Sequence, residues 1–142
     1  MHNYTFYDAN GSVLEQPGEH VAFLDPTTGL TWGSRLLDVD APMAECVEVA
    51  KKTMLCGVDG WRAPTIKEQV GIMDYDRFAP ALNPILFPNM PKYGWLWTSS
   101  VGAEPPRDSA WVVNLYYGYA YRNDQNSQGR VLVVRSAPLP RQ

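Results

Sequence analysis

Residues that commonly do chemistry are sparse in this chain, and their spacing does not suit catalysis. Cys46 and Cys56 are the only cysteines, and the only histidines, His2 and His20, lie far from both in the sequence. A zinc site needs more ligands at shorter spacings, so none is expected here. Two cysteines are too few for a disulfide framework; they either form one bridge or stay as separate buried thiols.

Other catalytic patterns are missing as well. No Ser-His-Asp or Cys-His arrangement and no glycine loop of the phosphate-binding kind stands out. Cys46 falls within an apolar helical pattern, without the electropositive neighbours that lower the pKa of a reactive thiol. Asp74 and Asp76 have the spacing of a metal pair, but a solvated loop after a helix is the commoner explanation. We therefore expect no catalytic residue, no metal site and no cofactor.

The stretch from Asn114 to Ser127 has a composition typical of molecular recognition. It combines four tyrosines with asparagine, serine, glycine and arginine, as antibody paratopes do. Tyrosine offers a large contact area at low entropic cost, and arginine is a frequent hot-spot residue. An ordinary hairpin with alternating aromatic packing and a polar turn is the alternative. The predicted ligand-binding residues are Tyr117, Tyr119, Tyr121, Arg122, Asn123, Asp124 and Asn126, with Tyr93 and Trp95 at the rim.

Two short amphipathic helices are predicted in the middle of the chain. Asp40 is expected to cap the first helix, with Pro42 in its first turn. The segment from Thr65 to Glu68 is a capping-box pattern that starts the second helix. The expected apolar faces are Met43, Val47, Ala50 and Met54 in the first helix and Ile66, Val70 and Met73 in the second.

Runs rich in β-branched and aromatic residues predict short strands on both sides of the helices. A turn is expected at Asp25–Gly29, and the prolines from Pro80 to Pro91 predict a long ordered loop. The chain shows no repeat or linker, so residues 1–142 are expected to form one α+β domain. The expected strands are 4–7, 21–24 and 30–32 before the helices, and 95–99, 110–115, 119–121 and 130–135 as one antiparallel sheet after them.

Composition limits the classes of function further. The hydrophobic fraction of 45% and the charged fraction of 19% are those of a folded domain, and the net charge of −3 disfavours a nucleic-acid binder. The first residues have neither a basic segment nor an apolar run, and no stretch is long enough to span a membrane. We therefore expect synthesis in the cytoplasm, action in a host cytoplasm or on a virion, and no direct contact with nucleic acid or membrane.

A series of motifs runs along most of the chain. Residues 25–32 read DPTTGLTW, residues 60–68 read GWRAPTIKE, and NPILF, WTSS and AWVV follow at Asn83–Phe87, Trp97–Ser100 and Ala110–Val113. Their order and spacing resemble those of the collagen-like adhesin (Lcl) C-terminal domain family, a domain of unknown function in most members. The resemblance covers about residues 21–135.

This resemblance implies a C-type-lectin-like fold, with two short helices packed on twisted antiparallel sheets. Relatives of that fold include formylglycine-generating enzymes and phage receptor-binding proteins, and members with known roles bind ligands on cell surfaces or virions. The family often carries a C-terminal cysteine that bridges to the helix cysteine, which Cys46 matches. Val133 stands in its place here, so that disulfide cannot form, which favours a reducing compartment. The tyrosine- and asparagine-rich stretch is also compatible with diversification by a retroelement.

Several residues within the motifs are expected to be structural. We expect Arg62 to pair internally, with backbone carbonyls or a carboxylate. Calcium-dependent sugar binding needs Glu-Pro-Asn and Trp-Asn-Asp triplets, whereas this chain has Glu-Pro-Pro at 104–106 and Trp-Val-Val at 111–113. Calcium is therefore not expected, and the charged residues of 104–108 are expected to form a solvated loop. Four motif tryptophans are expected to be core and corner residues: Trp32, Trp61, Trp97 and Trp111.

Three functions compete. The first is a non-catalytic, adhesin-like binding domain, phage- or prophage-encoded, that recognises a protein or glycan through the predicted residues. The second is an intracellular inhibitor or regulator of a bacterial host protein, such as a defence-system component, in which Glu104 and Asp108 mimic a nucleic-acid surface. The third, an oxidase like the formylglycine-generating enzymes, has the least support. Assembly into a homo-oligomer is left open.

Overall fold

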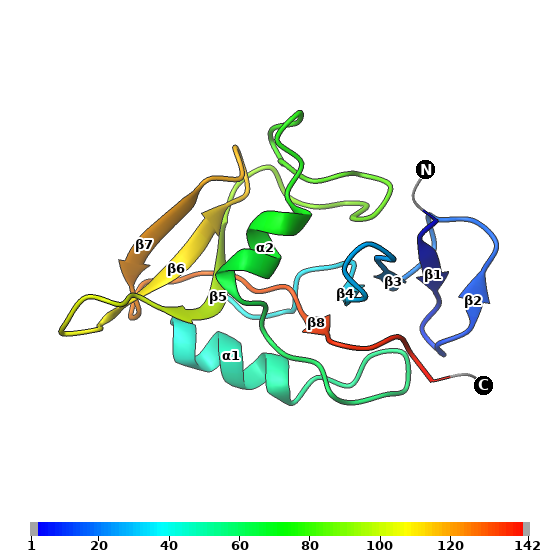
Figure 1. The fold of residues 1–142 in the computed structure, drawn as a ribbon, viewed down its shortest axis with the longest axis horizontal. Helices are drawn as coiled ribbons and strands as arrows, with labels where there is room; N and C mark the ends of the chain where they lie inside the picture. Colours follow the sequence, from blue (N-terminus) through cyan, green and yellow to red (C-terminus); the bar gives the residue numbers. More distant parts are fainter. Residues whose placement is uncertain (1–2, 141–142) are drawn as a thin grey trace.

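The computed structural model describes residues 3–140 of the chain, and Met1 and His2, part of the segment expected to lack a secretion signal, lie outside the described residues. Eight strands and two short helices in this part of the chain form an α+β fold built on two antiparallel sheets. Figure 1 shows the sheets at opposite ends, with the helices between them. The predicted α+β class with two short helices is confirmed.

The first sheet has five strands in the order β2-β1-β3-β4-β8. Its two central strands place Phe23 directly opposite Trp32, and both side chains are buried. The three strands predicted before the helices are present, whereas the short β2 was missed. The bounds are β1 Thr5–Tyr7, β2 Val13–Leu14, β3 Ala22–Leu24, β4 Thr31–Gly33 and β8 Val134–Arg135.

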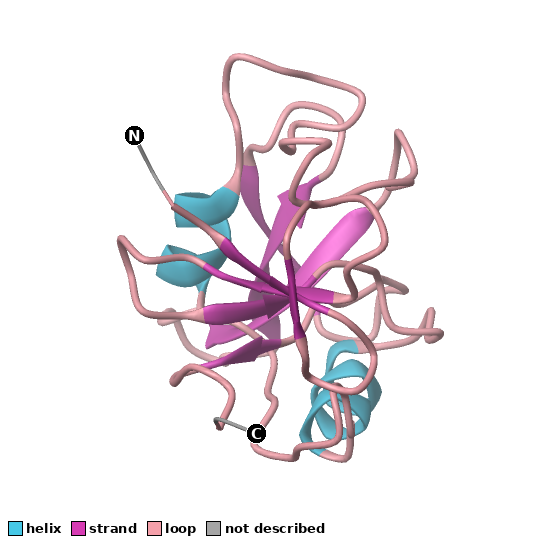
Figure 2. Cartoon of the chain, turned by 90° about the vertical axis from the view of Figure 1, so that its right-hand side faces the viewer, coloured by secondary structure: helices cyan, strands magenta, loops and turns pink. Residues whose placement is uncertain are grey.

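The second sheet has three strands, β5 (Trp95–Val101), β6 (Ser109–Asn114) and β7 (Ala120–Asp124), in that order. Successive side chains along a strand point to opposite faces, so Val112 and Val113 are both buried only if both faces are covered. Val112 belongs to the core cluster that contains helix α1, and Val113 to the cluster that contains the end of α2. Figure 2 shows the strands gathered between the two helices.

Helix α1 spans Met43–Lys51 and differs in detail from its prediction. Pro42, not Asp40, is its N-cap residue, and no side chain caps it. The helix ends at Lys51, so Met54 lies beyond it and is 64% exposed instead of completing the apolar face. The residues of α1 that are buried are Met43, Cys46 and Ala50.

Helix α2 spans Ile66–Ile72 and starts at the predicted capping box. The Thr65 hydroxyl accepts a hydrogen bond from the Glu68 backbone N–H at 3.2 Å, and the Glu68 carboxylate accepts one from the Thr65 N–H at 2.8 Å. Arg62 also donates to both oxygens of Glu68, at 2.7 and 2.8 Å. The expectation that Arg62 pairs internally is therefore confirmed.

The segment 130–135 was predicted to be a strand of the second sheet, but only Arg130 pairs with that sheet, through an isolated parallel bridge to Leu96 of β5. Only Val134–Arg135 forms a strand, β8, and it pairs with β4 in the first sheet (Figure 1). Residues 131–134 are all fully buried, with Val131 and Val133 in one core cluster and Leu132 and Val134 in the other. The apolar run thus comes from a segment buried on both sides between the sheets, which sequence alone does not distinguish from a central strand.

Three of the four motif tryptophans are core residues, as expected. Trp32, Trp61 and Trp97 are each at most 2% exposed. Trp111 on β6 is only half-buried, and the guanidinium of Arg122, which lies opposite it on the edge strand β7, is 6.0 Å from its ring centre. Trp111 is therefore a peripheral residue and not part of the core.

Candidate ligand-binding surface

The turn between β6 and β7 is held by a dense set of local hydrogen bonds. The Asn114 side chain accepts from the Tyr116 N–H at 2.6 Å, and the Asn114 carbonyl accepts from the Gly118 N–H at 2.7 Å. The Asn114 N–H donates to the Tyr119 carbonyl at 2.9 Å. Gly118 has φ +80°, a conformation that other residues rarely adopt. The sequence from Asn114 to Tyr119 therefore specifies one turn conformation.

Neighbouring loops fix this turn to the rest of the domain. The backbone N–H groups of Ala79 and Ala81 donate to the carbonyls of Tyr116 and Leu115, both at 2.8 Å. The Tyr75 hydroxyl donates to the Gly118 carbonyl at 2.9 Å. The loop that follows α2 and the β6–β7 turn thus form one hydrogen-bonded unit.

Six aromatic side chains gather on this unit, and we refer to them as the aromatic patch. Tyr93 stacks on Tyr116 with ring centres 5.3 Å apart, and Tyr117 stacks on Tyr119 at 5.6 Å. Tyr116 and Tyr117 are in edge contact at 4.5 Å, which joins the two pairs. All members except the half-buried Tyr116 are between 51% and 69% exposed. The patch consists of Tyr75, Phe78, Tyr93, Tyr116, Tyr117 and Tyr119.

A shallow pocket of about 240 Å³ opens within the patch. Its lining includes Tyr75, Phe78, Tyr117 and Tyr119, together with the charged loop residues Asp76 and Arg77. The Asp74 carboxylate accepts from the Asp76 N–H at 3.0 Å and pairs with Arg77 at 3.0 Å, so it shapes the loop that carries Phe78. Aromatic walls with charged groups at the margin suit a side chain or a ring that is partly apolar.

Of the nine residues predicted to bind ligand, three lie in the patch: Tyr93, Tyr117 and Tyr119. The sequence did not point to the other three members: Tyr116, which is next to the predicted Tyr117, and Tyr75 and Phe78, which lie far upstream in the loop after α2. The sequence indicated Tyr75 and Phe78 only weakly, because they lie among Asp and Arg residues in a loop that was expected to be solvated. Their place beside the hairpin depends on contacts between segments distant in sequence.

The other predicted residues are divided between the two faces of the sheet. Tyr121 lies opposite Val112, and its ring meets Trp95 at 5.4 Å. Arg122 lies opposite Trp111 and points to the other face, where its guanidinium is 3.4 Å from Glu104. Tyr121 and Arg122 are both exposed, but one flat partner surface cannot contact both side chains from a single face.

The polar end of the predicted stretch forms its own turn. The Asp124 carboxylate accepts from the Asn126 N–H at 2.8 Å, and the Asp124 carbonyl accepts from the Ser127 N–H at 2.9 Å. Asn123 lies on β7 opposite Ala110, on the same face as Tyr121. Asp124 therefore has a structural role in the turn, and Asn126 is exposed beside it.

The two cysteines are separate thiols, which decides between the alternatives left open by the sequence. Cys46 and Cys56 are both free and buried. Burial raises the pKa of the Cys46 thiol, and burial raises the pKa of the Cys56 thiol to about 11. Within residues 3–140, no group of three or more His, Cys, Asp or Glu side chains is placed to hold a metal ion.

The fold and surface define an α+β domain with two antiparallel sheets that carries a fixed, exposed aromatic patch at one hairpin. The sequence model of the Lcl C-terminal domain matches residues 22–135, and the chain belongs to this family, as its motifs predicted. No curated protein matches the chain. Neither helix of the described residues combines the length and the apolar composition that crossing a bilayer requires. The C-type-lectin-like fold stays a prediction.

Proposed function

We propose that this domain is a non-catalytic ligand-binding module that recognises a protein or glycan through the aromatic patch. The observation that carries the proposal is the set of five aromatic side chains that remain at least 51% exposed while lying in one connected cluster. Contiguous exposed apolar surface is costly in water and marks interaction sites in soluble proteins. Tyrosine and tryptophan are enriched at interfaces because they combine apolar area with a polar group.

The rigidity of the patch supports the same function. Association costs free energy for each side chain and loop that has to be ordered, and a prearranged surface avoids much of that cost. Here the stacked rings restrain one another, and the Tyr75 hydroxyl ties the loop to the Gly118 carbonyl. The phenol groups of Tyr93, Tyr117 and Tyr119 are therefore presented in a defined arrangement.

A role in binding rather than catalysis is supported by the state of the thiols. A reactive cysteine needs a lowered pKa, and burial moves the pKa of Cys46 and Cys56 in the opposite direction. This weighs against an oxidase of the formylglycine-generating kind, which requires activated thiols.

The inhibitor hypothesis stays a prediction. Glu104 and Asp108, which would imitate nucleic-acid phosphates, are both exposed as expected. Arg122 lies 3.4 Å from the Glu104 carboxylate, however, and reduces the negative charge that this loop presents.

The proposal is tested by the triple variant Tyr93→Ser/Tyr117→Ser/Tyr119→Ser. Binding of the full chain is first screened on glycan arrays and on immobilised bacterial surface and phage proteins, and each hit is titrated by biolayer interferometry. Truncating an aromatic side chain that contacts the partner is expected to cost at least about 1 kcal/mol, so the triple variant is expected to bind roughly 100-fold more weakly or worse.

The matched control is Val13→Ser/Met54→Ser, which removes two comparably exposed apolar side chains outside the patch. It is expected to bind like the wild type. A triple variant that stays folded and retains wild-type affinity for every hit rejects the patch as the binding surface.

A further inference from the structure

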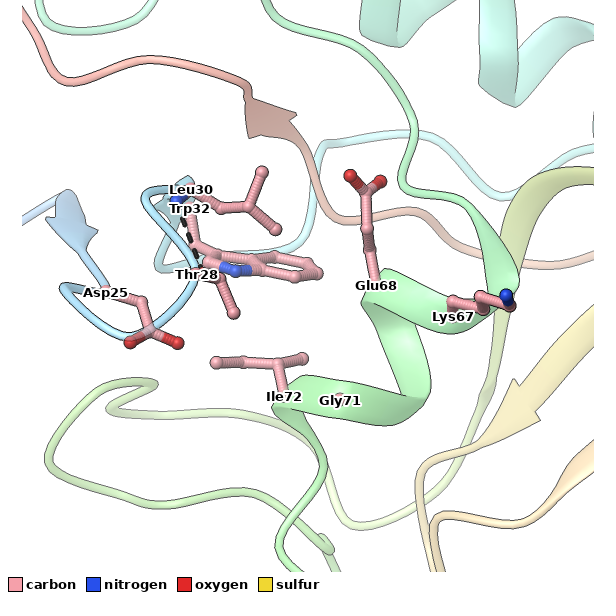
Figure 3. Close-up of a pocket in the computed structure, with 8 residues that line it drawn as sticks. All are labelled: Asp25, Thr28, Leu30, Trp32, Lys67, Glu68, Gly71 and Ile72. Carbon is pink, nitrogen blue, oxygen red and sulfur yellow. Dashed lines mark hydrogen bonds between the residues drawn. The ribbon is translucent and has the colours of Figure 1, made fainter.

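A second pocket, of about 420 Å³, lies between helix α2 and the turn that joins β3 to β4 (Figure 3). Its walls come from residues 25–32 and 67–72, and none of its lining residues belongs to the aromatic patch. The volume falls within the range of small-molecule sites in proteins, about 300–1,000 Å³. The established family membership and the proposed function assign nothing to it.

The walls of this pocket are fixed by hydrogen bonds. In the turn, the Gly29 N–H donates to the Asp25 carbonyl at 2.9 Å and the Asp25 N–H donates to the Leu30 carbonyl at 2.9 Å. The first residue of α2, Ile66, donates its N–H to the Ser100 hydroxyl at 2.9 Å, which anchors the helix to β5. The pocket is therefore already shaped for a ligand, without reordering of its walls.

The indole of Trp32 supplies an unused hydrogen-bond donor. Among the three buried tryptophans, the N–H of Trp61 donates to backbone carbonyls at 3.0 and 3.2 Å, and that of Trp97 donates to one at 3.1 Å. Trp32 is 1% exposed, yet its N–H has no acceptor among residues 3–140. Buried tryptophan N–H groups normally have a partner, so the acceptor for this one must come from solvent or a ligand.

This N–H reaches the pocket. In the described part of the chain, two side-chain polar atoms of residues that are not exposed have neither a hydrogen-bond partner nor solvent contact. They are the Ser34 hydroxyl oxygen and the Gln69 carbonyl oxygen. The Trp32 N–H is not one of them, so it touches solvent. Because Trp32 lines the pocket and has almost no other surface, the pocket is where that contact lies (Figure 3).

The rest of the lining is apolar or already paired. Leu30 and Ile72 extend their side chains on either side of the Trp32 ring, and the Lys67 amine points away from the pocket (Figure 3). Both oxygens of Glu68 are bound by Arg62. The remaining charge is the Asp25 carboxylate at the edge, which disfavours an anionic ligand.

We propose that this pocket binds a small neutral molecule. Its apolar body contacts the Leu30 and Ile72 side chains that flank the Trp32 ring, and a carbonyl or amide oxygen of the ligand accepts a hydrogen bond from the Trp32 N–H. This site is independent of the aromatic patch and of the function proposed for it.

Gly71 gives a variant that closes the pocket without harming the fold. It lies within α2 and lines the pocket, and a Cβ added there would meet no atom within 4 Å. Leucine is also a better helix former than glycine. Gly71→Leu is therefore expected to fill the pocket while its melting temperature stays at or above that of the wild type.

The experiment uses the full chain labelled with ¹⁵N and two probes of similar shape, acetophenone and ethylbenzene. The indole N–H resonance of Trp32 is assigned as the one lost in Trp32→Phe. Acetophenone is expected to shift this resonance with a Kd on the order of 1 mM, typical of a probe so small. Ethylbenzene, which has no acceptor, is expected to bind at least tenfold more weakly.

Gly71→Leu is expected to abolish the shift, whereas Lys51→Leu, an exposed change at the end of α1, leaves it unchanged. The patch variant Tyr93→Ser/Tyr117→Ser/Tyr119→Ser is also expected to keep the shift, which separates this site from the patch. The inference is overturned if acetophenone at about ten times that Kd leaves the Trp32 resonance in place, if the shift persists in Gly71→Leu, or if ethylbenzene binds equally well.

Discussion

Replacing Glu68 by alanine removes a carboxylate that serves two purposes at the start of α2. One oxygen accepts the Thr65 N–H at 2.8 Å and so completes the capping box. The two oxygens together hold the Arg62 guanidinium, which also donates to the Ser136 hydroxyl at 2.8 Å. Glu68→Ala therefore loosens the helix start and its connection to the C-terminal segment at once.

The expected destabilisation is about 2–3 kcal/mol. Loss of a capping interaction costs about 1 kcal/mol. A bidentate charged pair in a protein interior is worth more than that, but the Arg62 side chain is 34% exposed and recovers part of its hydration. We therefore assign the pair about 1–2 kcal/mol.

Urea unfolding of Glu68→Ala, Arg62→Met and the double variant measures both contributions. The coupling energy between positions 62 and 68 is expected to be at least about 1 kcal/mol, because either single substitution already removes the whole ion pair. Lys67→Ala, a neighbouring exposed change on the same helix, is the control and is expected to stay within about 0.5 kcal/mol of the wild type. If the two single variants prove additive, the pair has no role in holding α2, and the reasoning is refuted.

Three further predictions concern titration, reactivity and backbone strain. Hydrogen bonds from Arg62 lower the pKa of Glu68 below its ordinary value of 4.5, so the ionised carboxylate contributes its full stabilisation above pH 4.5. The free energy of unfolding is therefore expected to fall as the pH drops below 4.5. Acid titrations followed by circular dichroism are expected to show a less steep fall for Glu68→Gln. Cys46 and Cys56 are expected to resist Ellman's reagent at neutral pH and to react fully in denaturant; fast labelling of the native protein would contradict their burial. Gly118 and Gly29 have φ +80° and +75°, but only at Gly118 would an added Cβ come within 3.2 Å of neighbouring side-chain atoms. Gly118→Ala is therefore expected to lower the melting temperature more than Gly29→Ala. Equal shifts in the two variants would contradict this.

Local chemistry made parts of the fold predictable from the sequence. The capping box at Thr65 and Glu68 acts over three residues, and it formed as predicted. The prolines between 80 and 91 excluded helix and strand, and that segment is a loop. Large apolar side chains favour the core, and this places Trp32, Trp61 and Trp97 correctly, whereas Trp111 in the same kind of motif is only half-buried.

Pairing between distant segments was not predictable in the same way. The segment 131–134 has the apolar run of a central strand, yet its residues divide between two core clusters and only its end pairs with β4. For the candidate site, the composition of the stretch after Asn114 indicated exposed tyrosines, and Tyr117, Tyr119 and Tyr121 are exposed. Composition does not record which strand face each side chain takes, so Tyr121 and Arg122 were assigned to one surface although they lie on opposite faces.

The buried segment 131–134 has a consequence for how the chain acquires its structure during translation. Neither core cluster is complete until Val131, Leu132, Val133 and Val134 have inserted, and these residues are among the last of the family-matched segment 22–135 to be synthesised. A nascent chain still missing them exposes both unfinished halves of the interior on the ribosome. The interior can therefore close only once residues 131–134 have left the ribosome, and deleting these four residues is expected to disrupt both core clusters at once.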